Sequence, residues 1–83
     1  MKAVLQYTDS WNDKRWVYGI LAANNICVIK ERRGPSIYPK VTINIRNYDE
    51  LNKLVQELNQ KTAYGVSVVK VFEKSFIEKL FGL

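Results

Sequence analysis

Residues 15–23, Arg-Trp-Val-Tyr-Gly-Ile-Leu-Ala-Ala, decide the fold, because this stretch suits two different elements. As a strand it is rich in β-forming residues, and Asn24-Asn25 supplies a tight turn into a following strand. As a helix it gains a Ser-x-x-Asp capping box and a partial apolar stripe. The residues behind these helix signals are Ser10, Asp13, Val17, Ile20 and Leu21. Because Gly19 costs a helix about 1 kcal/mol relative to alanine, we favour the strand.

The two interpretations lead to different topologies of one fold class. A strand over residues 15–23 gives a β-meander followed by a helix, a strand and a second helix. Helical residues 11–23 give βαββαβ, the ferredoxin-like arrangement, which stands as the alternative. Either way the sequence predicts an α+β fold, with an antiparallel sheet of about four or five strands and a helix over residues 48–60 across one face.

Hydrophobic periodicity places the other elements. Strands are expected over residues 3–8, 26–31, 40–46 and 66–72. The helix over residues 48–60 has apolar residues at i, i+3, i+4 and i+7, the spacing of one helical face. These residues are Leu51, Leu54, Val55 and Leu58. Asn47 and Glu50 stand at the N-cap and N3 positions of a capping box. A second box, Ser75 to Glu78, predicts a short C-terminal helix over residues 75–82.

Length and composition exclude several classes of chemistry. The 83 residues suffice for a single domain, residues 1–83, and the 47% hydrophobic and 25% charged composition is that of a globular chain. The absence of histidine excludes a Ser-His-Asp or Cys-His centre and a histidine-bound metal. The single cysteine, Cys27, is expected to be a buried strand residue and excludes an internal disulfide. We therefore expect no enzyme activity, no cofactor and no metal.

The chain shows no targeting or membrane signal. Its longest apolar run, residues 17–23, is far shorter than the roughly 20 residues that a membrane span needs. The start has no apolar stretch long enough for a secretory signal. We expect a reduced, cytoplasmic protein without a membrane partner.

The positive charge is concentrated in the middle of the chain. The net charge is +5, and residues 14–46 contain seven basic residues, including all four arginines, against Glu31 alone. A segment this rich in arginine is typical of an anion-binding surface. The alternative is an ordinary solvated face, which is common in small basic domains.

Two groups of residues within this region are candidates for binding nucleic acid. The loop from Arg32 to Lys40 combines cations, which neutralise phosphates, with a tyrosine, which stacks on bases, on a backbone stiffened by two prolines. In the meander, Trp16 and Tyr18 share one strand face as a stacking platform; otherwise they belong to the core. The candidate binding residues are Lys14, Arg15, Trp16, Tyr18, Arg32, Arg33, Tyr38, Lys40 and Arg46.

Three further features have mainly structural interpretations. Tyr7 and Tyr64 are expected to be structural. Asp9 and Asp13 form a close acid pair, but two ligands without a third make a weak cation site. The last nine residues hold large apolar groups that either close the core or contact a second copy of the chain. The candidate contact residues are Phe76, Ile77, Leu80 and Phe81.

Two partial resemblances to known families connect these pieces. The first runs through Asn25-Ile-Cys-Val-Ile-Lys-Glu-Arg32, Gly34-Pro35, Val41-Thr-Ile-Asn-Ile45 and Tyr48 to Leu58. With these pieces, residues 16–60 resemble the positive-cofactor-four-like single-stranded-DNA-binding domains, which implies curved antiparallel strands, a basic loop and binding of single strands. The strand and helix expected after residue 62 depart from that family.

The second resemblance covers residues 41–72, with Thr42-Ile-Asn-Ile-Arg46, a helix and then Gly65-Val-Ser-Val68. This part resembles the small-ligand-sensing ACT domains, which implies the βαββαβ topology and a regulatory role. The glycine-containing ligand turn of those domains is replaced by Asp9-Ser-Trp-Asn12.

The sequence therefore predicts a small non-enzymatic accessory protein, of viral or mobile-element type, that binds nucleic acid. Single strands are preferred as the partner, through residues 14–46, by electrostatics and stacking without base-specific readout. A homodimer is expected, because so small a core gains from a second copy. The alternative function is a protein-binding or ligand-sensing regulatory module that acts as a dimer.

Overall fold

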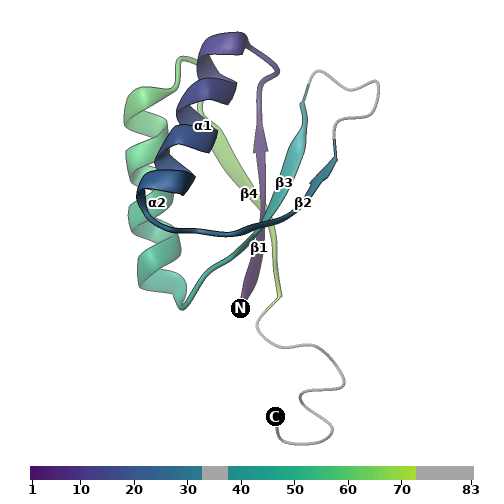
Figure 1. Ribbon diagram of the computed structural model, residues 1–83, viewed down its shortest axis with the longest axis vertical. Helices are drawn as coiled ribbons and strands as arrows, with labels where there is room; N and C mark the ends of the chain where they lie inside the picture. The colour runs from purple at the N-terminus through teal and green to yellow at the C-terminus, as the bar shows by residue number, and fades with distance from the viewer. Residues whose placement is uncertain (33–37, 73–83) are drawn as a thin grey trace, which may run out of the picture.

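The computed structural model describes residues 1–32 and 38–72, in which strands and helices follow one another as βαββαβ (Figure 1). The elements are β1 (Lys2–Tyr7), α1 (Trp11–Ala23), β2 (Val28–Arg32), β3 (Lys40–Asn44), α2 (Tyr48–Lys61) and β4 (Val66–Phe72). The α+β class is confirmed. The ferredoxin-like alternative is right and the preferred meander is wrong. The expected helix over residues 75–82 lies outside the described residues.

The four strands form one antiparallel sheet in the order β2-β3-β1-β4. The first strand therefore lies inside the sheet between β3 and β4, while β2 and β4 are its edges. Both helices cover the same face of this sheet (Figure 1). The opposite face carries no helix within the described part of the chain.

Residues 11–23 form a helix because its apolar side chains are needed to close the core. Val17, Ile20 and Leu21 are buried, and they join the cluster formed by the strands and α2. Gly19 lies on the exposed side with open space around its Cα, so it costs the helix only its intrinsic propensity. Tertiary packing therefore outweighs the local β-forming composition of this stretch.

The Asn24-Asn25 pair ends α1 instead of turning a hairpin. Asn25 adopts a left-handed conformation with φ 56°, which asparagine tolerates better than most residues. Its amide donates to the Ala22 carbonyl at 3.1 Å, and the Ile26 amide donates to the Leu21 carbonyl at 2.9 Å. These two bonds are the Schellman pattern of a helix C-terminus. Asn24-Asn25 suits a hairpin turn and a helix C-terminus equally, so this pair could not distinguish a strand from a helix over residues 15–23.

The second helix forms as its periodicity predicts. Leu51, Leu54 and Leu58 are buried, and Val55 is partly buried against the same core. The Asn47 side chain caps α2 by accepting a hydrogen bond of 2.8 Å from the Glu50 amide. The core residues are Ala3, Leu5, Tyr7, Val17, Ile20, Leu21, Val41, Ile43, Ile45, Leu51, Leu54, Leu58 and Val66. They lie between the helices and one face of the sheet, and the other face has no comparable cluster among the described residues.

Candidate functional site

The strand registers define which side chains share the face without helices. In β1 and β3 alternate residues are buried toward the helices, so the intervening residues project from the other side. Residues paired across the ladders lie on the same side, which extends this face to β2 and β4. We call this surface the open sheet face; it consists of Lys2, Val4, Gln6, Lys30, Arg32, Lys40, Thr42, Asn44, Ser67, Lys70 and Phe72.

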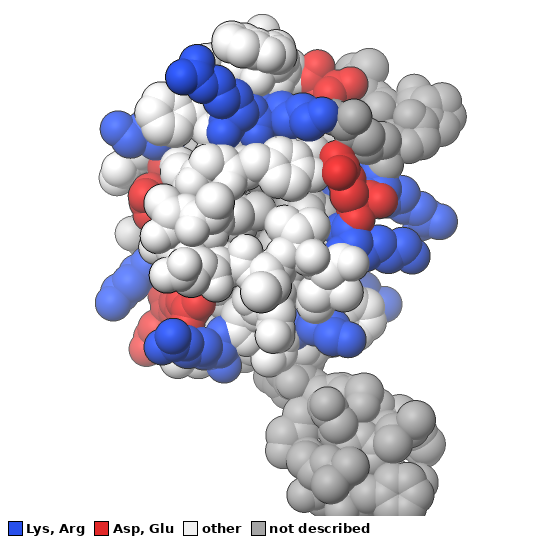
Figure 2. All heavy atoms as spheres, in the orientation of Figure 1, with Lys and Arg blue, Asp and Glu red and all other residues white. Residues whose placement is uncertain are grey.

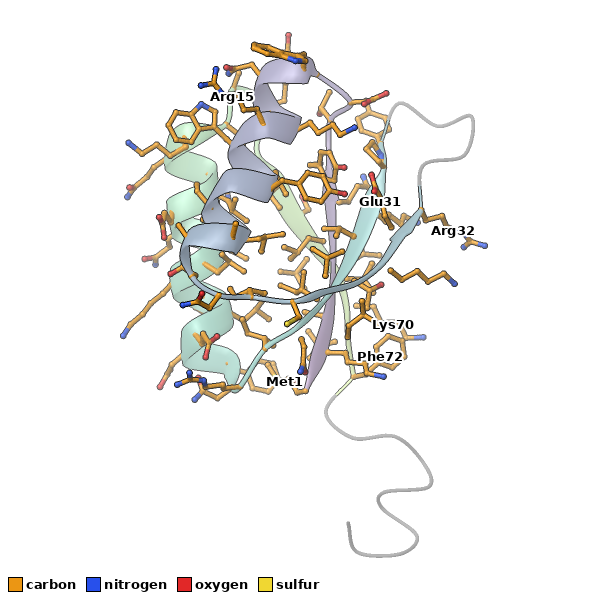
Figure 3. The ribbon with its side chains drawn as sticks, viewed as in Figure 1. Met1, Arg15, Glu31, Arg32, Lys70 and Phe72 are labelled. Atoms are coloured by element: carbon orange, nitrogen blue, oxygen red, sulfur yellow. The ribbon has the colours of Figure 1, made fainter. Side chains whose placement is uncertain are left out.

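The open sheet face carries five cations and no acid. They come from all four strands and are Lys2, Lys30, Arg32, Lys40 and Lys70. Glu31 pairs with Val41, which places it on the helix side, and Figure 3 shows it pointing toward α1 while Arg32 points away. In Figure 2 basic side chains project along the right-hand side, where β2 lies. The face therefore presents a uniformly positive array.

Two of these cations stand directly opposite each other. Arg32 and Lys40 are cross-strand partners in the β2–β3 ladder, and Lys40 is only half-exposed. Like charges in this position destabilise a sheet, because their side chains are only about 5 Å apart at Cβ. Among the described residues neither forms an ion pair that would offset the repulsion. An anion between the two side chains would relieve it.

An exposed aromatic ring lies at the edge of this array. Phe72, at the end of β4, is 41% exposed and is the cross-strand partner of Lys2. The Lys70 Nζ lies 4.6 Å from the centre of the Phe72 ring, a cation–π distance. Figure 3 shows both side chains on the side of the sheet away from the helices. The half-exposed Tyr38 immediately precedes the buried Pro39 and β3.

The structure separates the predicted binding residues. Arg32 and Lys40 lie in the open sheet face, whereas Lys14, Arg15, Trp16 and Tyr18 lie on α1 in the helix layer. Figure 3 shows Arg15 and Arg32 on opposite sides of the molecule. Arg33 lies outside the described residues, as do the predicted contact residues Phe76, Ile77, Leu80 and Phe81. Sequence neighbours within residues 14–46 are therefore not neighbours in space.

Trp16 and Tyr18 do not form the expected joint platform. Two residues apart on a helix are about 200° apart around its axis, so Trp16 is 40% exposed while Tyr18 packs against the core. The Tyr18 and Tyr7 rings meet edge to face, with centres 6.4 Å apart. Burial, and secondarily Tyr7 and Glu31, raise the pKa of Tyr18 well above its ordinary value. The prediction that Tyr7 is structural is confirmed by its burial.

Arg46 lies at the opposite end of the helix layer from Arg15. It precedes α2, and its Nε lies 3.6 Å from the Glu50 Oε2 in an exposed ion pair. Two adjoining cavities of about 220 and 330 Å³ open beside it and share Asn24 and Ile26 among their lining residues. The larger cavity includes Cys27, which is exposed and not buried as expected, because it precedes the edge strand β2 outside the core.

A second cationic surface forms where the start of α1 meets the end of α2. Trp11 is 77% exposed and Tyr64 is 70% exposed, which corrects the structural role expected for Tyr64. The Arg15 guanidinium lies 5.6 Å from the Trp11 ring centre, and the Lys61 Nζ lies 5.5 Å from that of Trp16. We call this surface the aromatic end; it consists of Trp11, Arg15, Trp16, Lys61 and Tyr64.

The aromatic end is tied together by a buried carboxylate. Asp13 has no exposed surface, and its two oxygens accept hydrogen bonds from the Ala63 amide at 2.8 Å and the Tyr64 amide at 3.0 Å. The Ser10 side chain does not cap α1. Both Asp13 oxygens therefore bind the loop after α2, which does not fit the cation site considered for Asp9 and Asp13. No group of three metal-ligating side chains is found within residues 1–32 and 38–72.

Sequence reasoning missed several residues of the open sheet face. Lys2, Lys30, Lys70 and Phe72 were not singled out: Lys2 and Lys70 lie outside the basic segment 14–46, and Lys30 and Phe72 were considered only as parts of expected strands. The available signal was strand alternation, in which a lysine or an aromatic opposite the buried side marks the second face. That signal becomes usable only when the pairing of the strands is known.

Comparisons with known proteins add no constraint on this site. The chain matches no protein-family model, no curated protein and no solved structure. In the part of the chain that the structure describes, no helix has the length and apolar character needed to cross a membrane. The geometry of the two cationic surfaces is therefore the basis for inferring a function.

Proposed function

We propose that this protein binds single-stranded nucleic acid across the open sheet face. The observation that carries the proposal is the direct opposition of Arg32 and Lys40 within five cations that no acid interrupts. The repulsion is not offset by a carboxylate on the same face, since Glu31 lies on the helix side, and this arrangement favours an anionic ligand. The cations are spaced across four strands. The phosphates of a nucleic-acid chain can reach several of them, whereas a single small anion cannot.

Each part of the face has a role in this proposal. The five cations neutralise phosphates, and Phe72 offers the face of its ring to an unpaired base. The Lys70 ammonium, which lies over this ring in the free protein, moves to a phosphate when a base takes its place. The uncharged centre of the face, including the half-buried Val4, contacts sugars and bases.

A single strand fits this arrangement better than a duplex. Stacking on an aromatic ring requires a base that is not paired and stacked in a duplex. The cations cover a broad sheet and not a protruding helix, which is the element that usually enters a major groove. Binding is therefore expected to tolerate many sequences, with modest preferences set by stacking.

The test is binding of a fluorescently labelled single-stranded oligonucleotide at several salt concentrations. If all five cations neutralise phosphates, log K against log salt has a slope of about −3.5. The double variant Arg32→Gln/Lys40→Gln reduces the slope to about −2.1. A matched variant that also removes two charges, Arg15→Gln/Lys61→Gln, leaves it unchanged. No binding at low salt, or equal slopes for the two variants, contradicts the proposal.

Self-association is a second candidate function, and the edge strand β4 favours it. Val68 and Val69 are 39% and 48% exposed on this edge, where Lys70 is the one charged residue of the strand. The other edge, β2, exposes Val28 and Ile29 to the same extent, but three of its five residues, Lys30, Glu31 and Arg32, are charged. Exposed apolar edges pair readily with another strand, and charged edges resist pairing. A dimer formed there predicts a melting temperature that rises with protein concentration. A melting temperature that stays constant over a hundredfold dilution contradicts it.

A further inference from the structure

The aromatic end is a second surface that the proposed function does not use. The chain contains two tryptophans, and both lie here, together with the exposed Tyr64. Trp11 and Tyr64 expose more than two thirds of their surfaces, which is unusual for side chains that normally bury a large area. The start of α1 and the end of α2 lie at the end of the molecule opposite the N-terminus (Figure 1).

This surface is held in place and not merely exposed. The buried Asp13 carboxylate joins the first turn of α1 to the loop after α2, so that Trp11 and Tyr64 are carried on connected backbone. Arg15 and Lys61 lie over the two indole rings at cation–π distances. Aromatic side chains on a backbone that is held in place lose less conformational freedom on binding than those on a mobile loop, which favours docking.

The residue types indicate the kind of partner. Tryptophan and tyrosine combine an apolar ring with a polar tip, and they concentrate at the headgroup level of membranes. Adjacent lysine and arginine are attracted to anionic lipid headgroups. We propose that the aromatic end docks the protein on the surface of an anionic lipid bilayer, with the indole rings among the headgroups and no segment crossing the membrane.

A bilayer suits this surface better than a nucleic acid. The aromatic end has two cations beside three aromatic side chains, whereas the open sheet face has five cations and one ring, so the sheet face can neutralise more phosphates of a strand. Insertion among headgroups uses the edges and tips of the rings, and the cations then remain beside the lipid phosphates. The exposed rings of the aromatic end also belong to side chains with polar tips, which favours headgroup depth over the hydrocarbon core.

The tryptophans make the test direct, because they are the fluorophores and the proposed contacts at once. The variants Trp11→Phe and Trp16→Phe each leave one tryptophan as a reporter and keep an apolar ring at the other position. With vesicles containing phosphatidylserine, both variants are expected to show a blue shift of emission at low salt. With uncharged phosphatidylcholine vesicles the shift is expected to be much smaller.

Matched charge variants locate the contact. Arg15→Gln/Lys61→Gln is expected to lower vesicle partitioning by about 25-fold, since each cation near an anionic surface contributes about fivefold. Arg32→Gln/Lys40→Gln removes the same charge from the open sheet face and leaves partitioning nearly unchanged. Circular dichroism checks that both variants are folded.

Three outcomes would overturn the proposal. The first is the absence of a shift with anionic vesicles. The second is an equal loss of partitioning for the two double variants, which would mean attraction by net charge alone. The third is a shift with a single-stranded oligonucleotide but not with vesicles, which would assign the aromatic end to nucleic acid. The vesicle measurements use no sheet-face ligand, so their result is independent of the proposed function.

Discussion

The open sheet face and the aromatic end contain the same kinds of residues in different surroundings. On the sheet, Arg32 and Lys40 oppose each other, and Phe72 is the single large aromatic side chain among the positions that define that face. At the aromatic end, Arg15 and Lys61 each lie over an indole ring. A cation beside a ring is stabilised before any ligand binds, whereas two cations side by side are not. The fold, and not the residue types alone, gives the two surfaces the different arrangements from which the two proposals are argued.

The largest expected effect concerns the scaffold of the aromatic end. Asp13→Ala removes a fully buried carboxylate and leaves the Ala63 and Tyr64 amides without their hydrogen-bond partner. Since hydrogen bonds to a charged group contribute about 1.5–3 kcal/mol each, we expect a loss of about 3 kcal/mol or more in the free energy of unfolding. Chemical denaturation measures it. Asp9→Ala, at an exposed position, serves as the control and should change stability by less than about 0.5 kcal/mol.

This variant also sharpens the comparison between the surfaces. At a temperature where Asp13→Ala remains folded, it should weaken vesicle binding and leave oligonucleotide binding intact, because Asp13 supports only the aromatic end. Equal losses on both ligands would mean that the two surfaces are not independent.

Local patterns in the sequence predicted much of the fold. The stripe of Leu51, Leu54 and Leu58 located α2, and Asn47 was correctly assigned as its cap. The stretch from Arg15 to Ala23 was misassigned, because its β-forming residues are informative locally while its helical state depends on closing the core. The local sequence does not show whether β propensity or packing in the core has the larger effect.

The candidate site was less accessible to sequence reasoning than the fold. A cluster of basic residues along the chain becomes a cluster in space only if the intervening elements keep it together. Here α1 takes Lys14 and Arg15 to the helix layer, while Arg32 and Lys40 stay in the sheet. Conversely, Lys2 and Lys40 share a face although 38 positions separate them in the sequence, and only the strand order brings them together.

The next largest effect tests the aromatic ring of the open sheet face. Phe72→Ala should weaken oligonucleotide binding by about 1–3 kcal/mol, the contribution of one base–aromatic stack. Phe72→Leu keeps an apolar side chain without a flat ring and should lose nearly as much. Trp16→Ala removes a ring from the aromatic end and should have no effect on this affinity. If Trp16→Ala weakens binding and Phe72→Ala does not, the two surfaces have been assigned the wrong way round.

The smallest effect is the most discriminating, because the two surfaces should respond with opposite signs. Arg32→Gln removes a like-charge cross-strand pair and should raise the free energy of unfolding by about 0.2–1 kcal/mol. Lys61→Gln removes a cation–π contact and a favourable charge at the C-terminus of α2, and should lower it by about 0.5–1 kcal/mol. Both changes remove one positive charge, so an effect of net charge alone would shift them in the same direction. In high salt the gain for Arg32→Gln should disappear, since exposed charges are screened there. A gain of stability for Arg32→Gln would mean that the native sheet loses stability by keeping the two cations together, which supports an anionic ligand at this site. A loss of stability for Arg32→Gln would contradict that conclusion.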